Sequence, residues 1–200
     1  MRIVFVRHGE GYHNLNDSSS KNKHNPNWDI LYPGLTSVGK KQAMNLYEKF
    51  MNENIDLVLV SPLKRTLETY EGMFKERSNI PVISLDIIRE CVKNRCDYRE
   101  SISKISTNYS NVDFTSIKEC DDVYKLTSNS EDKDKIVCRC NEFYNWLLDL
   151  TVNNKVKTLV VITHGAFLKE FLSIYSTKLG IINNLWFNNG EYRIGNINIK

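Results

Sequence analysis

The chain has 200 residues, of which 41% are hydrophobic, which is enough to fill the core of one domain spanning residues 1–200. Its formal net charge is +3, and its 27 Lys and Arg residues are interspersed with 24 Asp and Glu residues, so we expect no nucleic-acid partner. No apolar run approaches the length of a membrane span, and Arg7 interrupts the first apolar stretch. We therefore expect neither a membrane anchor nor a signal peptide.

The cysteines indicate a reducing compartment. Their number is odd, no CxxC pair occurs, and the four histidines lie far from them in the sequence. Cys138-Arg139-Cys140 could contribute to a metal site, but it lacks a matching second half. We therefore expect free thiols, a cytoplasmic location and no bound metal or other cofactor. The five cysteines are Cys91, Cys96, Cys120, Cys138 and Cys140.

The first quarter of the chain predicts one strand and one helix. Residues 3–6 (IVFV) form a continuous β-prone run, which is typical of a strand buried on both faces of a parallel sheet. Residues 15–31 are polar and predict a loop. Residues 36–51 have apolar positions near helical spacing, with Thr36 as a plausible N-cap, and predict a helix.

The middle of the chain continues this alternation. Residues 56–60 (DLVLV) predict a second strand, and residues 62–75 predict a helix with Pro62 at its first position, where proline is favoured. Residues 81–85 (PVISL) are a further strand candidate. Residues 91–127 are polar with only weak helical spacing, and a long loop in a compact domain is often a lid or a binding loop. We expect this region to form a substrate cap.

The last third of the chain completes the pattern. Residues 132–150 carry a broad apolar face, residues 158–162 (TLVVI) predict the last central strand, and residues 165–176 predict the helix after it. The region around residues 192–194 is expected to add an edge strand. Strands that alternate with helices in this way predict a three-layer α/β/α fold with a mostly parallel central sheet.

Reactive side chains follow the predicted strands. The first strand is followed by Arg7 and His8, and the last by His164. Arg65 lies about one helical turn beyond the second strand, and Glu90 ends the segment after the fourth candidate. Because ligands bind at the carboxyl ends of parallel strands, we expect these side chains to converge on one pocket.

This set of side chains suits phosphoryl transfer. Two guanidinium groups present planar forks to phosphate oxygens and neutralise their charge. A neutral imidazole can attack phosphorus to form a covalent phosphohistidine, and a second imidazole can stabilise the transition-state charge. A carboxylic acid with a raised pKa can protonate the leaving oxygen and then activate water. Arginine and histidine supply the positive charge, so this chemistry needs no metal.

Four motifs resemble those of the histidine phosphatase superfamily, also called phosphoglycerate mutase-like. The resemblance covers nearly the whole chain, and the motifs occur in order at sensible spacing. The motifs are Arg7-His8-Gly9 followed by Asn14, GLTSVGKKQA at residues 34–43, SPLKRTLET at residues 61–69, and Thr163-His164-Gly165. The resemblance implies the phosphoglycerate mutase-like form of the α/β/α fold.

The resemblance also implies a role for each matching residue. His8 would be the nucleophile, and Arg7, Arg65 and His164 would complete the phosphate pocket. Asn14 would assist a phosphate oxygen; read without the resemblance, it is an ordinary loop residue.

The acid/base carboxylate has more than one candidate. Glu90 matches the family position, although a surface acid is the alternative reading of that residue. Other acids lie near plausible site loops and could serve instead: Glu10, Glu119, Asp121 and Asp122.

Further segments resemble a eukaryotic branch of the phosphoglycerate mutase-like proteins. Within them His13 is expected to line the mouth of the site. Arg95 and Arg99 are candidates for binding a second anionic group of the substrate, and the alternative for both is a solvated charged loop. The segments are residues 11–14, 95–103, 120–124 and 188–193.

The expected function is metal-independent hydrolysis of a small phosphorylated substrate through a phosphohistidine on His8, with no membrane or nucleic acid bound. The first alternative is a phosphoglycerate mutase, which transfers the phosphoryl group to another hydroxyl. Such mutases are usually longer beyond the last strand, so a hydrolase is favoured. The second alternative is a catalytically silent phosphate-binding module, which the intact set of histidines and arginines disfavours. Neither the substrate nor the oligomeric state follows from the sequence.

Overall fold

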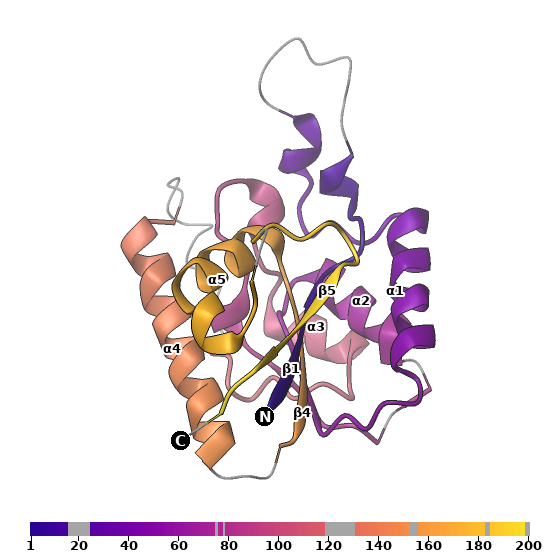
Figure 1. Ribbon diagram of the computed structural model, residues 1–200. Helices are drawn as coiled ribbons and strands as arrows, with labels where there is room; N and C mark the ends of the chain where they lie inside the picture. Colours follow the sequence, from indigo (N-terminus) through magenta and orange to yellow (C-terminus); the bar gives the residue numbers. More distant parts are fainter. Residues whose placement is uncertain are drawn as a thin grey trace.

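A five-stranded sheet occupies the centre of the computed structural model (Figure 1). The structure describes residues 1–15, 25–74, 76–77, 79–118, 131–152, 156–182 and 185–198. The strands are β1 (Arg2–Arg7), β2 (Leu57–Val60), β3 (Val82–Ser84), β4 (Thr158–Thr163) and β5 (Tyr192–Asn196). Their order in the sheet is β3-β2-β4-β1-β5, and all neighbours are parallel except β5, which is antiparallel to β1. Each predicted strand, including the edge strand, is confirmed.

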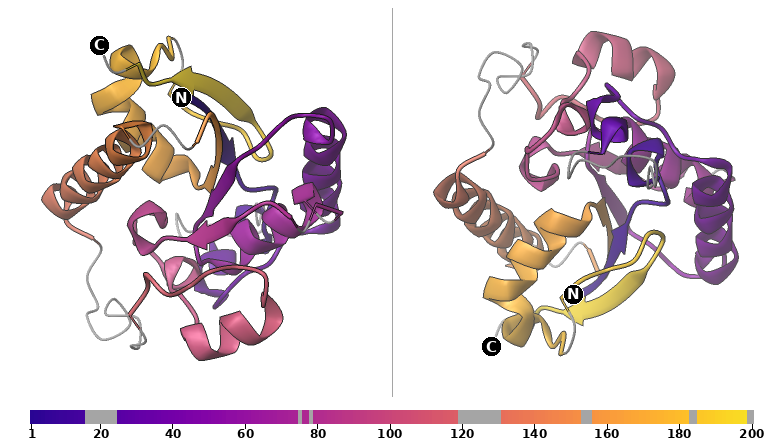
Figure 2. Two further views of the ribbon diagram at one scale, coloured as in Figure 1. Left: turned by 90° about the horizontal axis from the view of Figure 1, so that it is seen from below. Right: turned by 90° about the horizontal axis from the view of Figure 1, so that it is seen from above.

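Five α-helices cover the two faces of the sheet within the described residues (Figure 2). The helices α4 and α5 cover one face, and α1, α2 and α3 cover the other. This arrangement confirms the predicted three-layer fold with a mostly parallel sheet. The helices are α1 (Ser37–Phe50), α2 (Lys64–Phe74), α3 (Ile102–Asn108), α4 (Lys133–Val152) and α5 (Gly165–Leu179).

The central strand β1 contributes to both cores. Ile3 and Phe5 pack under α4 and α5, whereas Val4 and Val6 pack under α1 and α2. Successive side chains of a strand point to opposite faces, so a strand covered on both sides needs an apolar residue at every position. All four residues are fully buried, which accounts for the uninterrupted IVFV run.

The register of the central strands aligns the residues that follow them. Arg7 of β1 lies opposite Thr163 of β4, and the chain continues directly into His8 and His164. The backbone N–H of His8 donates to the carbonyl of Thr163 at 3.0 Å, so pairing extends one residue beyond β1. Because parallel strands end at the same edge, the two histidines leave the sheet side by side.

One helix start differs from the prediction. Thr36 caps α1 as expected, but Pro62 is not the first residue of α2, because it lies before the helix. The hydroxyl of Thr66 donates to the carbonyls of Ser61, at 2.8 Å, and Leu63, at 2.5 Å. These bonds hold the residues between β2 and α2 in a turn, so the helix begins later than the proline suggests.

The helix α5 is longer than predicted. It continues past Ser176 to Leu179 and ends at Gly180, whose φ of 68° is left-handed. Glycine adopts this conformation without the penalty of a Cβ, so Gly180 is the residue that ends the helix.

The polar stretch at residues 15–31 contains the short helix η2 (Pro26–Asp29). Asn25 caps it through a hydrogen bond accepted from the N–H of Asn27 at 3.0 Å. Residues 16–24 lie outside the described part of the chain.

The region at residues 91–127 contains η4 (Arg95–Asp97) and α3. The helix α3 was not predicted, because a short helix shows little periodicity; it packs into the core through Ile102 and Ile105. Residues 119–127 lie outside the described residues, and the substrate cap remains a prediction.

Cysteines in the described residues form no disulfide. Cys91, Cys96 and Cys140 are buried and Cys138 is exposed, whereas Cys120 lies outside the described residues. Burial raises the pKa of the buried thiols, to about 12 for Cys96 and for Cys140. These thiols stay protonated near neutrality and act as packing groups.

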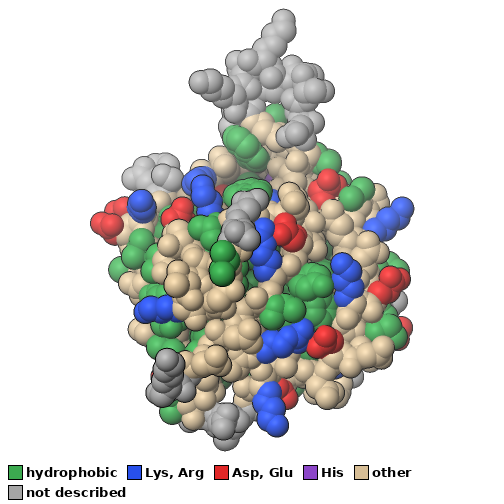
Figure 3. Space-filling view, viewed as in Figure 1, with side chains coloured by type: hydrophobic (Ala, Val, Ile, Leu, Met, Phe, Trp, Pro, Cys, Tyr) green, Lys and Arg blue, Asp and Glu red, His purple; other side chains and the backbone are tan. Residues whose placement is uncertain are grey.

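The surface carries both signs of charge. On the face shown in Figure 3, Lys and Arg side chains lie among Asp and Glu side chains instead of forming one large patch. None of the helices that the structure describes is both long and apolar enough to cross a membrane.

At the end of the sheet opposite His8, the Met1 ammonium group donates to the carbonyl of Ile197 at 2.7 Å.

A close approach of two backbones fixes the loop after β1. The N–H of Thr36 donates to the carbonyl of Glu10 at 2.9 Å, and the Thr36 hydroxyl donates to the Glu10 carboxylate at 2.6 Å. A Cβ on Gly39 would overlap the Glu10 carbonyl, and one on Gly9 would lie 2.5 Å from the carbonyl oxygen of Gly39. Backbone atoms cannot swing aside as a side chain can, so both positions need glycine.

We expect Gly39→Ala to lower the free energy of unfolding by ~1–3 kcal/mol. The overlap with the Glu10 carbonyl should outweigh the higher helix propensity of alanine, which stabilises a helix by about 1 kcal/mol relative to glycine. Urea denaturation measures the change. Val38→Ala is the control, since Val38 is 49% exposed on the same helical turn. A Gly39→Ala protein as stable as the wild type would contradict the close packing.

Candidate active site

Three histidine rings meet at the carboxyl edge of the sheet. The ring centroids of His8 and His164 lie 5.1 Å apart, and the centroid of His13 lies 5.5 Å from that of His8. His8 follows β1, His164 follows β4, and His13 belongs to the short helix η1 (Tyr12–Asn14). All three side chains are buried. The structure therefore brings together the two histidines that the sequence placed at one edge.

One ring nitrogen of His8 is fixed as a donor by its surroundings. Nδ1 lies 2.6 Å from the carbonyl oxygen of Gly9, which can only accept, so we assign the proton to Nδ1. The lone pair of the neutral ring is then on Nε2. Burial, followed by the charge of Arg65, holds the pKa of His8 well below its usual value. His8 is therefore an unprotonated base at neutral pH.

His164 is oriented by a serine at the end of β2. The Ser61 hydroxyl oxygen lies 2.8 Å from His164 Nε2 and accepts a long hydrogen bond, 3.5 Å, from the N–H of Leu63. If Ser61 donates its proton to Nε2, the proton of the neutral ring lies on Nδ1. Nδ1 is buried and has no hydrogen-bond partner among the described residues. His164 thereby offers a donor to a bound ligand.

Arg7 is held at the end of β1 by the segment before β5. Its Nη1 donates to the carbonyl of Phe187 at 2.6 Å, and its Cζ lies 5.1 Å from the ring centroid of Trp186. A Cβ on Gly165 would lie 3.0 Å from Arg7 Nε, so the first residue of α5 must be small. Nε itself has no hydrogen-bond partner in the described part of the chain.

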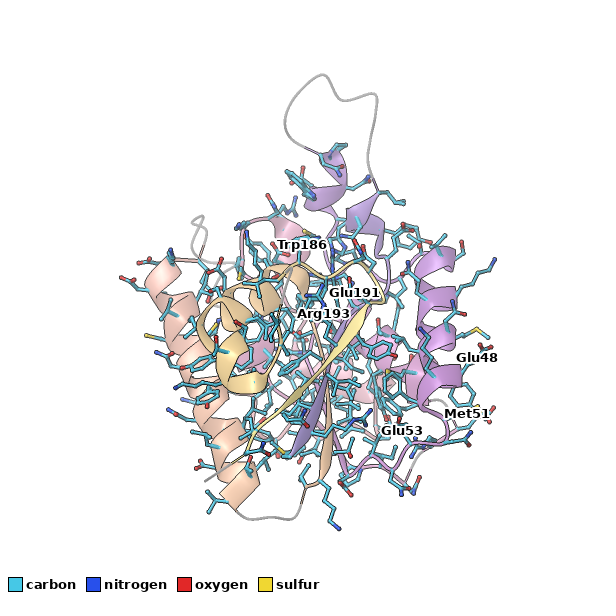
Figure 4. All side chains as sticks on the ribbon, viewed as in Figure 1. Glu48, Met51, Glu53, Trp186, Glu191 and Arg193 are labelled. Carbon is cyan, nitrogen blue, oxygen red and sulfur yellow. The ribbon has the colours of Figure 1, made fainter. Side chains whose placement is uncertain are left out.

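Side chains of β5 and its turn brace the segment that holds Arg7 (Figure 4). Arg193 donates to the carbonyl of Trp186 at 2.6 Å and pairs with Glu191 at 2.7 Å. Glu191 also accepts from the N–H of Asn188 at 2.7 Å. The Phe187 carbonyl is therefore fixed from both sides before it meets Arg7.

Arg65 is anchored by η4. Its guanidinium donates to the carbonyl of Cys96 at 2.7 Å and to the carboxylate of Asp97 at 3.3 Å. Asp97 also accepts from the backbone N–H groups of Lys93 and Asn94, both at 3.1 Å. The side chains of Arg65 and Asp97 are 1% and 8% exposed. Burial of either charge alone would be unfavourable, and each charge compensates the other.

Glu90 lies at the N-terminus of α5, beside His164. Its carboxylate accepts from the backbone N–H groups of Cys91, at 2.9 Å, Ala166, at 3.2 Å, and Phe167, at 2.9 Å. Burial, and then the charge of Asp97, raise the pKa of this carboxyl group, although part of the residue remains accessible to solvent. A raised pKa is what a group needs to carry a proton in and out of a reaction near neutrality.

The other candidate acids are placed differently. The Glu10 carboxylate accepts from the Thr36 hydroxyl, and its N–H donates to the Gln42 side chain at 2.7 Å, so α1 engages this residue. The remaining candidates, Glu119, Asp121 and Asp122, lie outside the described residues.

Asn14 and His13 line the loop above His8. The side-chain oxygen of Asn14 accepts from the N–H of Gly11 at 3.0 Å and from the Asn189 amide at 3.1 Å, which leaves the Asn14 NH₂ group to donate. Burial and the charges of nearby arginines lower the pKa of His13 to about 2. Its buried Nδ1 also has no hydrogen-bond partner among the described residues.

The two arginines predicted to bind a second anionic group have different surroundings. Arg95 is exposed on η4. Arg99 is buried, with its Nε 3.3 Å from the Asp86 carboxylate and its Nη1 3.1 Å from the Glu100 carbonyl. A substrate would reach Arg95 more directly than Arg99.

Sequence reasoning assigned no role to three residues that hold the site. Asp97 anchors Arg65, Ser61 orients His164, and the hydroxyl of Thr69 accepts from the N–H of Gly9 at 3.1 Å. Ser61 and Thr69 belong to the SPLKRTLET segment and could have been identified from it. Asp97 could not, because its position depends on the irregular path of residues 91–97.

Several buried nitrogen atoms at this edge lack hydrogen-bond partners within the described residues. Buried polar atoms without partners are rare, and a bound ligand is one explanation for them. An anion with several oxygens can accept from more than one such donor. The atoms are Arg7 Nε, Arg65 Nε, His13 Nδ1 and His164 Nδ1. No three His, Cys, Asp or Glu side chains in the described ranges are grouped in a way that could hold a metal ion.

We expect the histidines to make the protein less stable in acid. The pKa values of His8, His13 and His164 are lowered in the folded state, so below about pH 6.5 the unfolded chain binds protons that the folded chain does not. For each such histidine, the free energy of unfolding falls by about 1.4 kcal/mol per pH unit as the pH decreases. Urea denaturation from pH 7 to pH 5 should show a smaller loss for His13→Asn than for the wild type. Equal slopes would mean that His13 titrates normally in the folded protein.

Comparison with known proteins identifies the family. A family model described as histidine phosphatase superfamily, branch 1, matches residues 3–194. Phosphoglycerate mutase-like protein 1 of Arabidopsis thaliana is 29% identical over 203 residues, which cover 86% of this chain and 70% of that protein. A Schizosaccharomyces pombe protein named as a probable phosphatase is 26% identical over 184 residues, with 86% of this chain and 77% of that protein covered.

The fold is shared with solved structures. The alpha-ribazole phosphatase from Shigella flexneri is similar with a TM-score of 0.64 and 20% sequence identity, over 99% of this chain and 91% of that one. This likeness concerns the fold, whereas the family model extends over nearly the whole sequence. The chain belongs to branch 1 of the histidine phosphatase superfamily.

Proposed function

We propose that the protein hydrolyses phosphomonoesters without a metal ion, through a phosphohistidine formed on His8. The observation that carries this proposal is the 2.6 Å contact between His8 Nδ1 and the Gly9 carbonyl oxygen, which assigns the ring proton to Nδ1 and leaves Nε2 as a nucleophile. Buried donors of Arg7, Arg65 and His164 without partners among the described residues surround it. A phosphoryl group would supply acceptor oxygens for these donors and negative charge to balance the two guanidinium groups.

In the first step, His8 Nε2 forms a bond to phosphorus while the bond from phosphorus to the ester oxygen breaks. The guanidinium groups of Arg7 and Arg65 and the ring of His164 bind the non-bridging oxygens and stabilise their charge in the transition state. The protonated carboxyl of Glu90 gives its proton to the departing oxygen, so the alcohol leaves uncharged. The carbonyl that accepts from Nδ1 stabilises the positive charge on the phosphorylated ring.

In the second step, the Glu90 carboxylate takes a proton from a water molecule. The water oxygen bonds to phosphorus, and the bond between phosphorus and His8 Nε2 breaks. Inorganic phosphate leaves, His8 regains its lone pair, and Glu90 is protonated again. One carboxyl group therefore serves as acid and then as base. This requires a pKa near the working pH, where both its protonated and its ionised form are accessible.

The proposed acceptor is water instead of a second hydroxyl group, and the relative named as a probable phosphatase supports this choice. We assign Asn14 to the phosphate through its free NH₂ group. Arg95 is the better placed candidate for a second anionic group of the substrate, because it is exposed on η4, the helix that anchors Arg65.

We expect the wild-type protein to form an acid-labile, base-stable phosphoenzyme with a ³²P-labelled phosphomonoester, trapped by quenching the reaction in alkali with detergent. The variant His8→Ala should form none and should lose at least about 10³-fold in hydrolysis of an aryl phosphate, because the nucleophile is gone. Urea denaturation of both proteins controls for folding. Unchanged hydrolysis by His8→Ala would refute the proposed function.

We expect Glu90→Gln to slow the hydrolysis of an alkyl phosphate, such as glycerol 2-phosphate, by about 10²–10⁴-fold. Phosphoenzyme formation from p-nitrophenyl phosphate, measured in a single turnover, should be affected much less, since p-nitrophenolate is stable enough to leave without a proton. Dephosphorylation, in which Glu90 is the base, should slow for both esters. In the wild type, kcat for the alkyl ester should fall as the pH rises through the pKa of Glu90, which lies above its usual value of 4.5. If phosphoenzyme formation slows equally from the two esters, Glu90 is not the proton donor.

A further inference from the structure

We propose that Arg139 is a positioning residue that holds the carboxyl group of Glu90 where it can protonate the leaving oxygen. Arg139 lies on α4, and its guanidinium reaches across to the segment at residues 87–90, which ends in Glu90. It does not belong to any motif that indicated the function. The inference rests on the proposed function, because it assumes that Glu90 is the acid.

The first support is the number of carbonyl groups that Arg139 binds. Its Nη1 donates to the carbonyls of Ile87 and Arg89, at 2.9 and 3.0 Å, and its Nη2 lies 3.5 Å from the carbonyl of Glu90. The Thr163 hydroxyl donates to the remaining carbonyl of this segment, that of Ile88, at 2.5 Å. The carbonyl groups of residues 87–90 thus accept hydrogen bonds from side chains, because this segment lies outside the sheet and has no neighbouring strand to pair with.

The second support is the ion pair that holds Arg139 itself. Its Nε and Nη2 donate to the two carboxylate oxygens of Glu131, at 2.7 and 2.6 Å. Glu131 also pairs with the residue two beyond Glu90: its N–H donates to the Val92 carbonyl at 2.8 Å, and its carboxylate accepts from the Val92 N–H at 3.3 Å. The side chain of Glu131 is fully buried. The pair therefore clamps the chain on both sides of Glu90.

The charges of the clamp cancel. A lone guanidinium beside Glu90 would favour the ionised carboxylate and lower its pKa, whereas Glu131 neutralises that influence. Burial and Asp97 raise the pKa of Glu90, and neither member of the clamp contributes notably to that shift. Arg139 can therefore fix the segment without making Glu90 a weaker proton carrier.

The clamp also reaches the helix that receives Glu90. The Arg139 Cζ lies 5.3 Å from the ring centroid of Phe167, and the N–H of Phe167 donates to the Glu90 carboxylate at 2.9 Å. One guanidinium thus contacts the backbone before the carboxyl group and the residue that binds it. A shift of Arg139 would move both.

The test compares two esters with two variants. We expect Arg139→Met to lower the single-turnover rate of phosphoenzyme formation from glycerol 2-phosphate about 10–100-fold, as misplacing a general acid does, while the same rate from p-nitrophenyl phosphate stays near the wild-type value. KM for both esters should change little, because the phosphate ligands are untouched. Arg139→Lys should recover part of the loss, since an ammonium group can bind some of the carbonyls but cannot form the fork with Glu131.

Two controls separate positioning from general support. Lys135→Met removes an exposed cation from the same helix and should change neither ester. Adding Arg139→Met to Glu90→Gln should cause no further loss on glycerol 2-phosphate, because residues that act through one group are not additive. If Arg139→Met does not fold, Glu131→Gln replaces it; this variant keeps the shape of the clamp but not its charge and should show a smaller selective loss.

Equal losses on the two esters, or no loss on either, would overturn the positioning role while leaving the proposed function intact. An additive effect with Glu90→Gln would do the same. A wild-type protein that hydrolyses neither ester would instead refute the proposed function, and the role of Arg139 with it. A loss confined to the alkyl ester, partly recovered by lysine, would establish the inference.

Discussion

Two buried guanidinium groups and three buried imidazoles share one edge of the sheet, and the rest of the site depends on holding them there before an anion arrives. Burial, and then the positive charges of Arg65 and Arg7, lower the pKa values of His8, His13 and His164 and keep the rings neutral. Like charges in a buried site are unfavourable unless something opposes them. A phosphoryl dianion, the ligand of the proposed reaction, would oppose them directly.

A layer of ion pairs and carboxylates behind the site keeps this arrangement rigid. Arg7, Arg65 and the segment ending in Glu90 are each held by a group that other contacts fix in turn. The acids of this layer lie behind these three residues. Glu131 and Glu191 pair with arginines of this layer, whereas Asp97 pairs with Arg65 itself. Groups aligned in advance need no reorganisation during the reaction. The partners are Glu191 and Arg193 behind Arg7, Asp97 behind Arg65, and Glu131 and Arg139 behind Glu90.

Sequence patterns predicted the parts of the molecule that repeat and missed those that do not. The strands were recognisable because a strand buried on both faces needs apolar residues throughout, and the register then places His8 beside His164. The helix α3 and the anchors Asp97 and Arg139 follow no period. Asp97 and Arg139 contact carbonyl and amide groups of residues 87–97, and the path of that irregular segment is not encoded in any local pattern. The motifs thus predicted which side chains meet at this edge of the sheet, but not what holds them there.

The contact between Glu90 and α5 joins two parts of the reaction. The backbone N–H groups of Ala166 and Phe167 favour the carboxylate, whereas burial and Asp97 favour the neutral acid. In the proposed mechanism Glu90 both gives and takes a proton, and opposing influences suit such a group better than either alone. His164 is the N-cap residue of the same helix. The proposed proton donor and the ring proposed to bind the phosphoryl oxygens therefore contact one rigid element, and a displacement of α5 would misplace both together.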